Sequence, residues 1–437
     1  MKIAWFKKVI SPEIGAKLAG YSLNDVSEMK LDDLYATGLY VEDGQGEKAL
    51  IISLDLLGVD EWFIRKVRKA CSEMLGVDDA AVMLSCTHTH TGPETRTMAS
   101  KPEQLYIEYL NRLEATLISA VKEMLDGELL ECQVSFYSCQ CDENRNRRYS
   151  SGDNRATFVP HRREVIPACT GFTDKELGGL IFTHSANSRR RPVYVIGNYA
   201  AHPLAGHSYG LGGLRISADF PGAFREYVAN NTGAEAMFIS GAAGDMVPKE
   251  DELGDEAMRS MGIRLGKVAL GGILEATRSP RRFDMPDAKV GSISRTFTVP
   301  LRLKYRNNPK KLPKPYLGSD TVTLEIQCIA IGDVCFVGVP GELCAELGQE
   351  IKWHSPFRRT FIAYNSTAYF SYMGPANFLV AGGYEGMSQR FTARGGLELV
   401  KTASDAMFEL REMLYPSTGE EAYPDNCPDS LYNILPN

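Results

Sequence analysis

Two stretches of the sequence decide the fold: KALIISLDLLGV at residues 48–59 and AAVMLSCTHTHTG at residues 80–92. Each contains the apolar run of a buried strand and then ends in polar residues. Between them, residues 60–75 repeat apolar side chains at helical spacing. The three segments together predict a βαβ unit, in which a helix packs on a sheet.

The rest of the chain alternates between strand-like and helix-like patterns. Strands and helices interleaved in this way predict an α/β or α+β fold, with one domain over residues 1–437 and a mixed β-sheet flanked by helices. We expect a strand at 128–140, hairpins at 179–202 (turn at 186–190) and 321–342 (turn at Gly332-Asp333), and helices at 102–125, 219–232, 253–277, 342–353 and 398–414.

Composition excludes several classes of protein. The chain has 437 residues, 48 Lys+Arg and 55 Asp+Glu, and its net charge of −7 disfavours a general nucleic-acid or anionic-membrane binder. It contains no apolar window of about 18 residues, so no membrane span and no stable membrane association are expected. The N-terminal residues lack a signal-peptide pattern, and we interpret the ten cysteines as reduced thiols. A cytoplasmic location is therefore expected.

The first candidate for chemistry is the histidine pair in SCTHTHTGP (residues 85–93), where His88 and His90 follow a predicted strand. If the strand continues, both imidazoles point to the same face. Neutral imidazole is a favoured zinc ligand, although two loop histidines can also serve only as hydrogen-bonding groups. Because the chain has seven histidines, two at one strand end favour the functional interpretation.

Two further candidates also lie at predicted strand ends. His202 in NYAAHP follows the strand at 193–196, and Glu342 in VPGE follows a strongly apolar strand and begins a predicted helix. Taken alone, a single histidine is more often structural, and an acidic residue in a first helical turn is favoured by the helix dipole. Together, two histidines and a carboxylate form the three-ligand set of a catalytic zinc site.

The sequence motifs in these segments resemble those of a known family. THTHTGP is similar to the THTHSGP motif of the neutral/alkaline non-lysosomal ceramidases, and NYAAHP, ISADFPG, FISGAAGD, VPGE and GYEG resemble segments that follow in the same order in the catalytic domain of that family. The resemblance extends from GYS (20–22) to beyond Gly386 and so covers most of the chain.

The resemblance implies zinc as the cofactor and a set of four ligands. In the family a ligand tyrosine lies twelve residues before the tyrosine of the YEG segment, and here Tyr372 precedes Tyr384 by the same spacing. The implied ligands of Zn²⁺ are His88, His202, Glu342 and Tyr372.

The resemblance also implies which residues face the substrate amide. These are His90, Tyr384 and the arginine of an Asn-Arg motif. In CDENRNRRYS that arginine is either Arg145 or Arg147. We prefer Arg147, because the family motif places variable residues just after it.

From these residues we expect a zinc-dependent hydrolase that cleaves the C–N bond of a small or moderately apolar, linear or cyclic amide. The alternatives are an ester or lactone hydrolase, a reverse, amide-forming enzyme on the same site, and an inactive metal-containing binding protein. The expected partner is a small-molecule amide substrate, with no nucleic acid, and homo-oligomer formation is left open.

Two features lead us to expect a substrate other than ceramide. Secreted ceramidases carry a signal peptide and a C-terminal immunoglobulin-like domain, and we expect this chain to have neither. The stretches expected to border the site are polar: RTMASKPE (96–103), ENRNRRYSSGDNR (143–155) and HSYGLGGLR (207–215). Such loops build hydrogen-bonding pockets, which favour compact polar amides.

Overall fold

The structure is a computed structural model, and it describes residues 1–20, 25–96, 104–150, 156–158, 171–186, 190–206, 214–249 and 254–416. Its centre is an eight-stranded sheet in which β4 with β5 and β11 with β13 are parallel pairs, while the other neighbours that pair are antiparallel. In spatial order the strands are β13 (Glu235–Ser240), β11 (Pro192–Tyr199), β10 (Glu176–His184), β6 (Leu130–Gln140), β1 (Lys2–Val9), β3 (Tyr35–Glu42), β4 (Lys48–Leu54) and β5 (Val82–Cys86).

A second sheet of four strands packs against the first. Its order is β15 (Val290–Pro300), β16 (Thr321–Ile331), β17 (Val334–Gly338) and β19 (Arg359–Ala363). The remaining strands form short pairs: β2 (Met29–Lys30) with β12 (Arg215–Ile216), β7 (Asn144–Asn146) with β14 (Met246–Pro248), β8 (Arg148–Ser150) with β9 (Ala156–Phe158), and β18 (Glu342–Leu343) with β20 (Tyr372–Met373).

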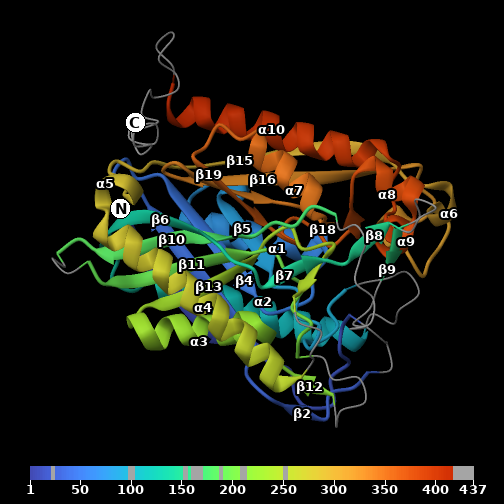
Figure 1. The fold of residues 1–437 in the computed structure, drawn as a ribbon, viewed down its shortest axis with the longest axis horizontal. Helices are drawn as coiled ribbons and strands as arrows, with labels where there is room; N and C mark the ends of the chain where they lie inside the picture. The colour runs from blue at the N-terminus through green and yellow to red at the C-terminus, as the bar shows by residue number, and fades with distance from the viewer. Residues whose placement is uncertain are drawn as a thin grey trace, which may run out of the picture.

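Helices cover the outer faces of both sheets. Figure 1 shows α10 along one edge of the molecule and α3 and α4 along the opposite edge, with the sheets between them. The helices are α1 (Glu61–Leu75), α2 (Gln104–Leu125), α3 (Asp219–Thr232), α4 (Asp255–Arg278), α5 (Pro280–Phe283), α6 (Leu303–Arg306), α7 (Ala345–Trp353), α8 (Ala376–Ala381), α9 (Gly383–Ser388) and α10 (Arg394–Leu414). The predicted fold class, a mixed sheet flanked by helices, is confirmed.

The alternation of side chains along β4 explains the layering. Leu50, Ile52 and Leu54 belong to the core shared with α1 and α2, whereas Ala49 and Ile51 belong to the core shared with the four-stranded sheet. Successive residues of a strand point to opposite faces, so one short strand contributes to both cores. This explains why its sequence is apolar throughout rather than alternating.

Most of the predicted elements are present, and two boundaries matter for the site. The strand predicted over residues 80–92 ends at Cys86, so both histidines lie beyond it. The helix predicted to begin at Glu342 begins at Ala345, and Glu342 lies instead in β18. The interpretation of Glu342 as a first-turn helix residue is therefore wrong. The middle of the turn predicted at 186–190 lies outside the described residues.

The two edge strands of the eight-stranded sheet, β5 and β13, come together at their carboxyl ends. Ser240 Oγ donates a hydrogen bond to the Thr87 carbonyl (2.7 Å), and Ser53 Oγ donates one to the Phe238 carbonyl (2.6 Å). Both hydroxyls are buried. These contacts use side chains in place of a strand-to-strand ladder, and they place the loop after β5 beside the loops after β11 and β13.

The end of β19 joins the same junction. Ser85 Oγ donates to the Tyr364 carbonyl (2.8 Å), and the Tyr364 amide donates to the Ser240 carbonyl (3.0 Å). We call Ser53, Ser85 and Ser240 the serine seam. Through it, the ends of strands from both sheets converge on one place.

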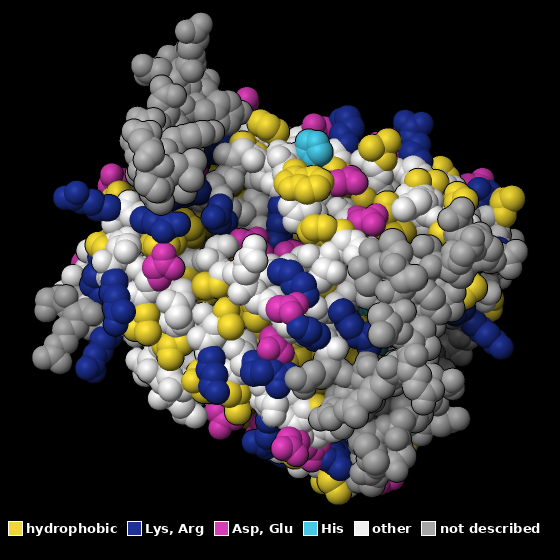
Figure 2. Space-filling view, in the orientation of Figure 1, with side chains coloured by type: hydrophobic (Ala, Val, Ile, Leu, Met, Phe, Trp, Pro, Cys, Tyr) yellow, Lys and Arg dark blue, Asp and Glu magenta, His cyan; other side chains and the backbone are white. Residues whose placement is uncertain are grey.

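Two features relate to possible partners: the charge of the surface and the hydrophobicity of the helices. On the face drawn in Figure 2, Lys and Arg side chains are interspersed with Asp and Glu, so its described part presents no broad field of one sign. Within the described ranges, no helix is both long enough and apolar enough to cross a bilayer. The eight cysteines described are all free thiols, and Cys169 and Cys427 lie outside the described residues.

We predict that the serine seam contributes measurably to the free energy of unfolding. Ser240→Ala removes the donor to the buried Thr87 carbonyl and should lower the free energy of unfolding by about 1–3 kcal/mol, as expected for an unsatisfied buried polar group. Urea denaturation measures this change. Ser404→Ala on α10 is the matched control, because Ser404 Oγ donates to Val400, a carbonyl within its own helix. An equal effect of the two substitutions would contradict the special role of the seam.

Candidate metal centre and active site

The loop after β5 is held so that His88 turns inward. The backbone of His88 has φ = +72°, a left-handed conformation that non-glycine residues rarely adopt and that is often found at functional sites. Its Nδ1 lies 2.7 Å from the Leu57 carbonyl, while the hydroxyls of Thr89 and Thr91 both donate to the Ser217 carbonyl (2.8 and 2.9 Å). A turn fixed by hydrogen bonds, rather than a continued strand, therefore directs the histidines.

His202 reaches the same point from the loop after β11. Its Nδ1 lies 2.5 Å from the Ala243 carbonyl, so the ring proton resides on Nδ1 and the lone pair on Nε2. The His90 amide donates to the Pro203 carbonyl (3.1 Å), which ties the two histidine loops together. Nε2 of His202 is buried and has no hydrogen-bond partner.

The three imidazoles converge in a buried cluster with one carboxylate. One ring nitrogen from each of His88, His90 and His202 lies within 4.8 Å of the others. Oε2 of Glu342 lies 3.5 Å from Nε2 of His88 and 3.4 Å from Nε2 of His202. These four side chains are at most 9% exposed. The group could hold a metal ion, and the unpartnered nitrogen of His202 fits that use.

Burial also sets the protonation of the cluster. It lowers the pKa of His202 to about 4, an effect strengthened by the nearby positive charge of Arg147. Burial likewise holds the pKa of His90 well below its usual range, and the neighbouring His88 and His202 add to this effect. Both imidazoles are therefore neutral at pH 7, which is the form that binds metals.

A cavity of about 170 Å³ opens onto the cluster. It is lined by Gly20, Leu57, His88, His90, Arg96, Lys310, Lys311, Glu342, Tyr369, Ser371, Tyr372, Tyr384, Ser388 and Arg390. Gly20 matters here because a β-carbon at this position would lie 2.4 Å from Nδ1 of His90. Of the loops predicted to border the site, most of residues 96–103 and 207–215 and the end of 143–155 lie outside the described residues.

The fold of this chain has counterparts among solved structures. The crystal structure of neutral ceramidase from Pseudomonas aeruginosa superposes with a TM-score of 0.76 and 18% identity, over 94% of this chain and 75% of that chain. A structure described as ceramidase complexed with C2 gives a TM-score of 0.76 and 17% identity over the same shares. The chain has the fold of neutral ceramidase. No family model and no curated protein matches the sequence.

Tyr372, the tyrosine singled out by its spacing, lies beside Glu342 in the ceramidase-like fold. The two residues are register partners in the parallel pair β18–β20, and both line the cavity. The Tyr372 ring contacts the Tyr384 ring with centroids 5.3 Å apart. Tyr384 is 44% exposed and so stands at the mouth of the cavity.

The two candidate arginines occupy different places. Arg147 is buried, donates from Nη2 to the Tyr372 hydroxyl (3.2 Å) and from Nε to Glu385 Oε1 (2.7 Å), and lies near the Tyr384 ring. Arg145 lies in β7, in register with Val247 of β14. Arg147 is thus the arginine that contacts the predicted tyrosines.

Two tyrosines that contact the carboxylate were not predicted from the sequence. The Tyr369 hydroxyl donates to Oε1 of Glu342 (2.5 Å), and the Tyr364 hydroxyl donates to Oε2 (3.3 Å). Their signal was the stretch AYNSTAYFSYM (363–373), which contains three tyrosines close together in the sequence. The twelve-residue spacing selected Tyr372 from this loop and passed over the other two.

A Gly-x-Ser-x-Gly pattern, GHSYG at 206–210, also follows His202 in the sequence. In serine hydrolases the serine of this motif sits on a sharp turn directly between a strand and a helix. Here β11 ends at Tyr199, well before the motif. Residues 207–210 lie outside the described part of the chain.

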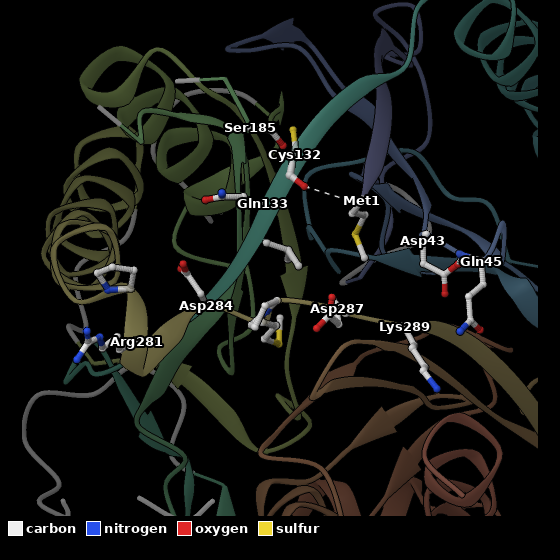
Figure 3. Close-up of a pocket in the computed structure, with 16 residues that line it drawn as sticks. Met1, Asp43, Gln45, Cys132, Gln133, Ser185, Arg281, Asp284, Asp287 and Lys289 are labelled. Carbon is white, nitrogen blue, oxygen red and sulfur yellow. Dashed lines mark hydrogen bonds between the residues drawn. The ribbon is translucent and has the colours of Figure 1, made fainter. Parts of the chain in front are cut away.

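A second, larger cavity of about 690 Å³ is drawn in Figure 3, and none of its described lining residues is a histidine. Asp43 and Gln45 on its wall precede β4, whereas the histidine cluster lies beyond the carboxyl end of that strand. Two of its charged groups have structural partners: Asp284 pairs with Arg190, and Lys289 donates to the Leu414 carbonyl. The histidine cluster is therefore the better candidate site.

The geometry predicts that the purified protein retains one divalent transition-metal ion per chain, measured by elemental analysis after dialysis. His202→Ala should lose this ion, because it removes the buried, unpartnered Nε2. His354→Ala is the control, since His354 is an exposed histidine at the end of α7. A wild-type protein without stoichiometric metal, or metal retained by His202→Ala, would contradict the prediction.

Proposed function

We propose that this protein is a zinc-dependent hydrolase that cleaves the C–N bond of an amide. The observation that carries the proposal is the buried convergence of His88, His90, His202 and Glu342 in a chain with the fold of neutral ceramidase. The name of that structural neighbour supports an amide as the bond cleaved. The motif resemblance between the sequences supports the same reaction.

In this proposal His88, His202, Glu342 and Tyr372 hold the zinc ion. Two imidazole nitrogens and a carboxylate are the usual donors of catalytic zinc sites. The Nδ1 atoms of both histidines face backbone carbonyls, an arrangement that leaves Nε2 as the ligand atom. When bound, zinc supplies a Lewis acid that polarises a carbonyl and provides a water nucleophile at neutral pH.

His90 transfers the proton in the proposed mechanism. It lies beside His88, with the two Nε2 atoms 3.3 Å apart, and it lines the cavity that would receive the substrate. Because its imidazole is neutral, it can accept a proton as water attacks and deliver it to the leaving amine nitrogen. The close packing against Gly20 fixes the orientation of the ring.

In this proposal Tyr384 and Arg147 help to stabilise the oxyanion that develops on the substrate carbonyl. Burial raises the pKa of Tyr384, so its phenol remains protonated and can donate a hydrogen bond to the former carbonyl oxygen. Arg147 contacts the rings of both Tyr372 and Tyr384, with its guanidinium carbon 5.6 Å from each centroid. Arg147 would thereby orient the two phenols as well as polar groups of the substrate.

The cavity supports a compact substrate. Its volume of about 170 Å³ is below the roughly 300–1,000 Å³ of typical drug-sized ligand pockets. Among the described residues, its lining combines serine, tyrosine, arginine and lysine side chains with a single aliphatic one, Leu57. A small polar amide matches this lining better than two long alkyl chains do.

The assigned roles predict different behaviour of two histidine variants. His90→Ala should keep its zinc and lose amide turnover by about two to four orders of magnitude, the range expected for a general acid–base residue. His202→Ala should lose both zinc and activity. Metal content and turnover are measured on the same preparations. Loss of zinc from His90→Ala would make His90 a ligand and contradict its role in proton transfer.

The cavity also predicts a substrate preference. Short N-acyl amides or cyclic amides should be cleaved with a higher kcat/KM than a long-chain ceramide dispersed in detergent, and without any need for detergent. Each methylene left in water forfeits about 0.8 kcal/mol of binding free energy, so a cavity that cannot enclose alkyl chains gains nothing from them. A clear preference for ceramide would contradict this expectation.

A further inference from the structure

Arg390 differs from the other buried arginines near the site. It is 6% exposed and lines the cavity of the histidine cluster. Arg147 and Arg148 pair with Glu385, and Arg96 pairs with Glu94. Within the described part of the chain Arg390 forms no ion pair, and its Nη1 has no hydrogen-bond partner.

An unpaired guanidinium in this position is unfavourable for folding. A charge removed from water needs a counter-ion or a full set of hydrogen bonds to offset its desolvation. Burial lowers the pKa of Arg390 to about 10, and the positive charge of Arg96 acts in the same direction. The group is therefore still a cation at pH 7. The carboxylates of Glu342 and Asp60 act on it through space, but no described carboxylate forms an ion pair with it.

The rest of the cavity wall adds to this positive charge. Lys310 and Lys311 line it, are exposed, and form no ion pair with the described residues. The carboxylate on the wall is Glu342, which lies among the histidines and accepts hydrogen bonds from Tyr364 and Tyr369. Among the described residues, the cavity wall therefore carries an excess of positive charge.

We propose that Arg390 is a carboxylate-binding residue and that the substrate is an amide carrying a carboxylate group near the bond that is cleaved. This inference rests on the proposed amide hydrolysis and names its substrate class. A guanidinium matches a carboxylate with two parallel hydrogen bonds, and a cavity of about 170 Å³ admits only a short spacer between the two groups. The carboxylate belongs either to the amine portion, as in an N-acyl amino acid, or to the acyl portion, as in a dicarboxylic acid monoamide.

Two matched substrate pairs test the proposal and separate these sources. Butanoate release is compared for N-butanoylglycine and N-butanoylglycinamide, and methylamine release for N-methylsuccinamate and N-methyl-4-oxopentanamide. The wild-type enzyme should prefer the charged member of one pair by about 10- to 100-fold in kcat/KM, as expected for a charge-assisted bidentate contact. In Arg390→Met the ratio should fall to near one. No preference in either pair, or a ratio unchanged in Arg390→Met, would overturn the proposal.

Two further variants make the result specific. Arg390→Lys keeps the charge without the planar fork and should give an intermediate ratio, which also serves if Arg390→Met does not fold. Arg358→Gln removes one exposed positive charge that is not on the cavity wall and should leave the ratio unchanged. A loss of preference in Arg358→Gln equal to that in Arg390→Met would show a general charge effect and would overturn the role of Arg390.

Binding without turnover distinguishes this inference from the proposed function. N-butanoylglycine or N-methylsuccinamate at millimolar concentration should raise the melting temperature of the wild-type protein but not that of Arg390→Met. If the zinc-loaded enzyme cleaves none of the four amides and this shift is present, the proposed reaction fails and the carboxylate site stands. If neither compound shifts the melting temperature and neither pair shows a preference, the carboxylate site fails.

Discussion

The meeting of strand ends at the serine seam is the constraint on which the rest of the site depends. β5 and β13 are opposite edges of one sheet, and no backbone ladder joins them. Buried hydroxyls of Ser53, Ser85 and Ser240 instead donate to carbonyls across the junction. A serine side chain is short, so each such bond fixes the spacing of two backbones. The hydrogen bonds of the serine seam therefore fix the positions of the loops that carry His88 and His202.

In the loop next to the serine seam, one residue adopts a backbone conformation that is unfavourable for its residue type. His88 has a left-handed backbone, an arrangement that costs about 1–3 kcal/mol where it is imposed on a non-glycine residue. The threonines on either side of His90 offset this by donating to the same Ser217 carbonyl. The alternation of threonine and histidine in this motif thus has a structural basis: the threonines anchor the turn, and the histidines face the cavity.

What the sequence could predict was the part that local patterns determine. The βαβ unit at 48–86 and the Gly332-Asp333 hairpin follow from apolar periodicity and turn chemistry, and the structure contains both. The four-stranded sheet and the seam depend on pairings between distant segments, which periodicity does not encode. Glu342 was misplaced in a helix for the same reason, because only its pairing with Tyr372 through β18 and β20 makes it part of a strand. Tyr369 and Arg390 carried no motif of their own.

Two buried polar atoms, one in the histidine cluster and one on the wall of the adjoining cavity, connect the stability of this protein to its chemistry. Nε2 of His202 is a buried acceptor without a donor, and Nη1 of Arg390 is a buried donor without an acceptor. Each lowers the stability of the ligand-free chain, since buried polar groups are normally satisfied. A cation would satisfy the first group and an anion the second, so one ligand cannot serve both. The histidine cluster and the cavity beside it therefore suit two partners of opposite charge, and each should stabilise the folded protein in proportion to its preference for that state.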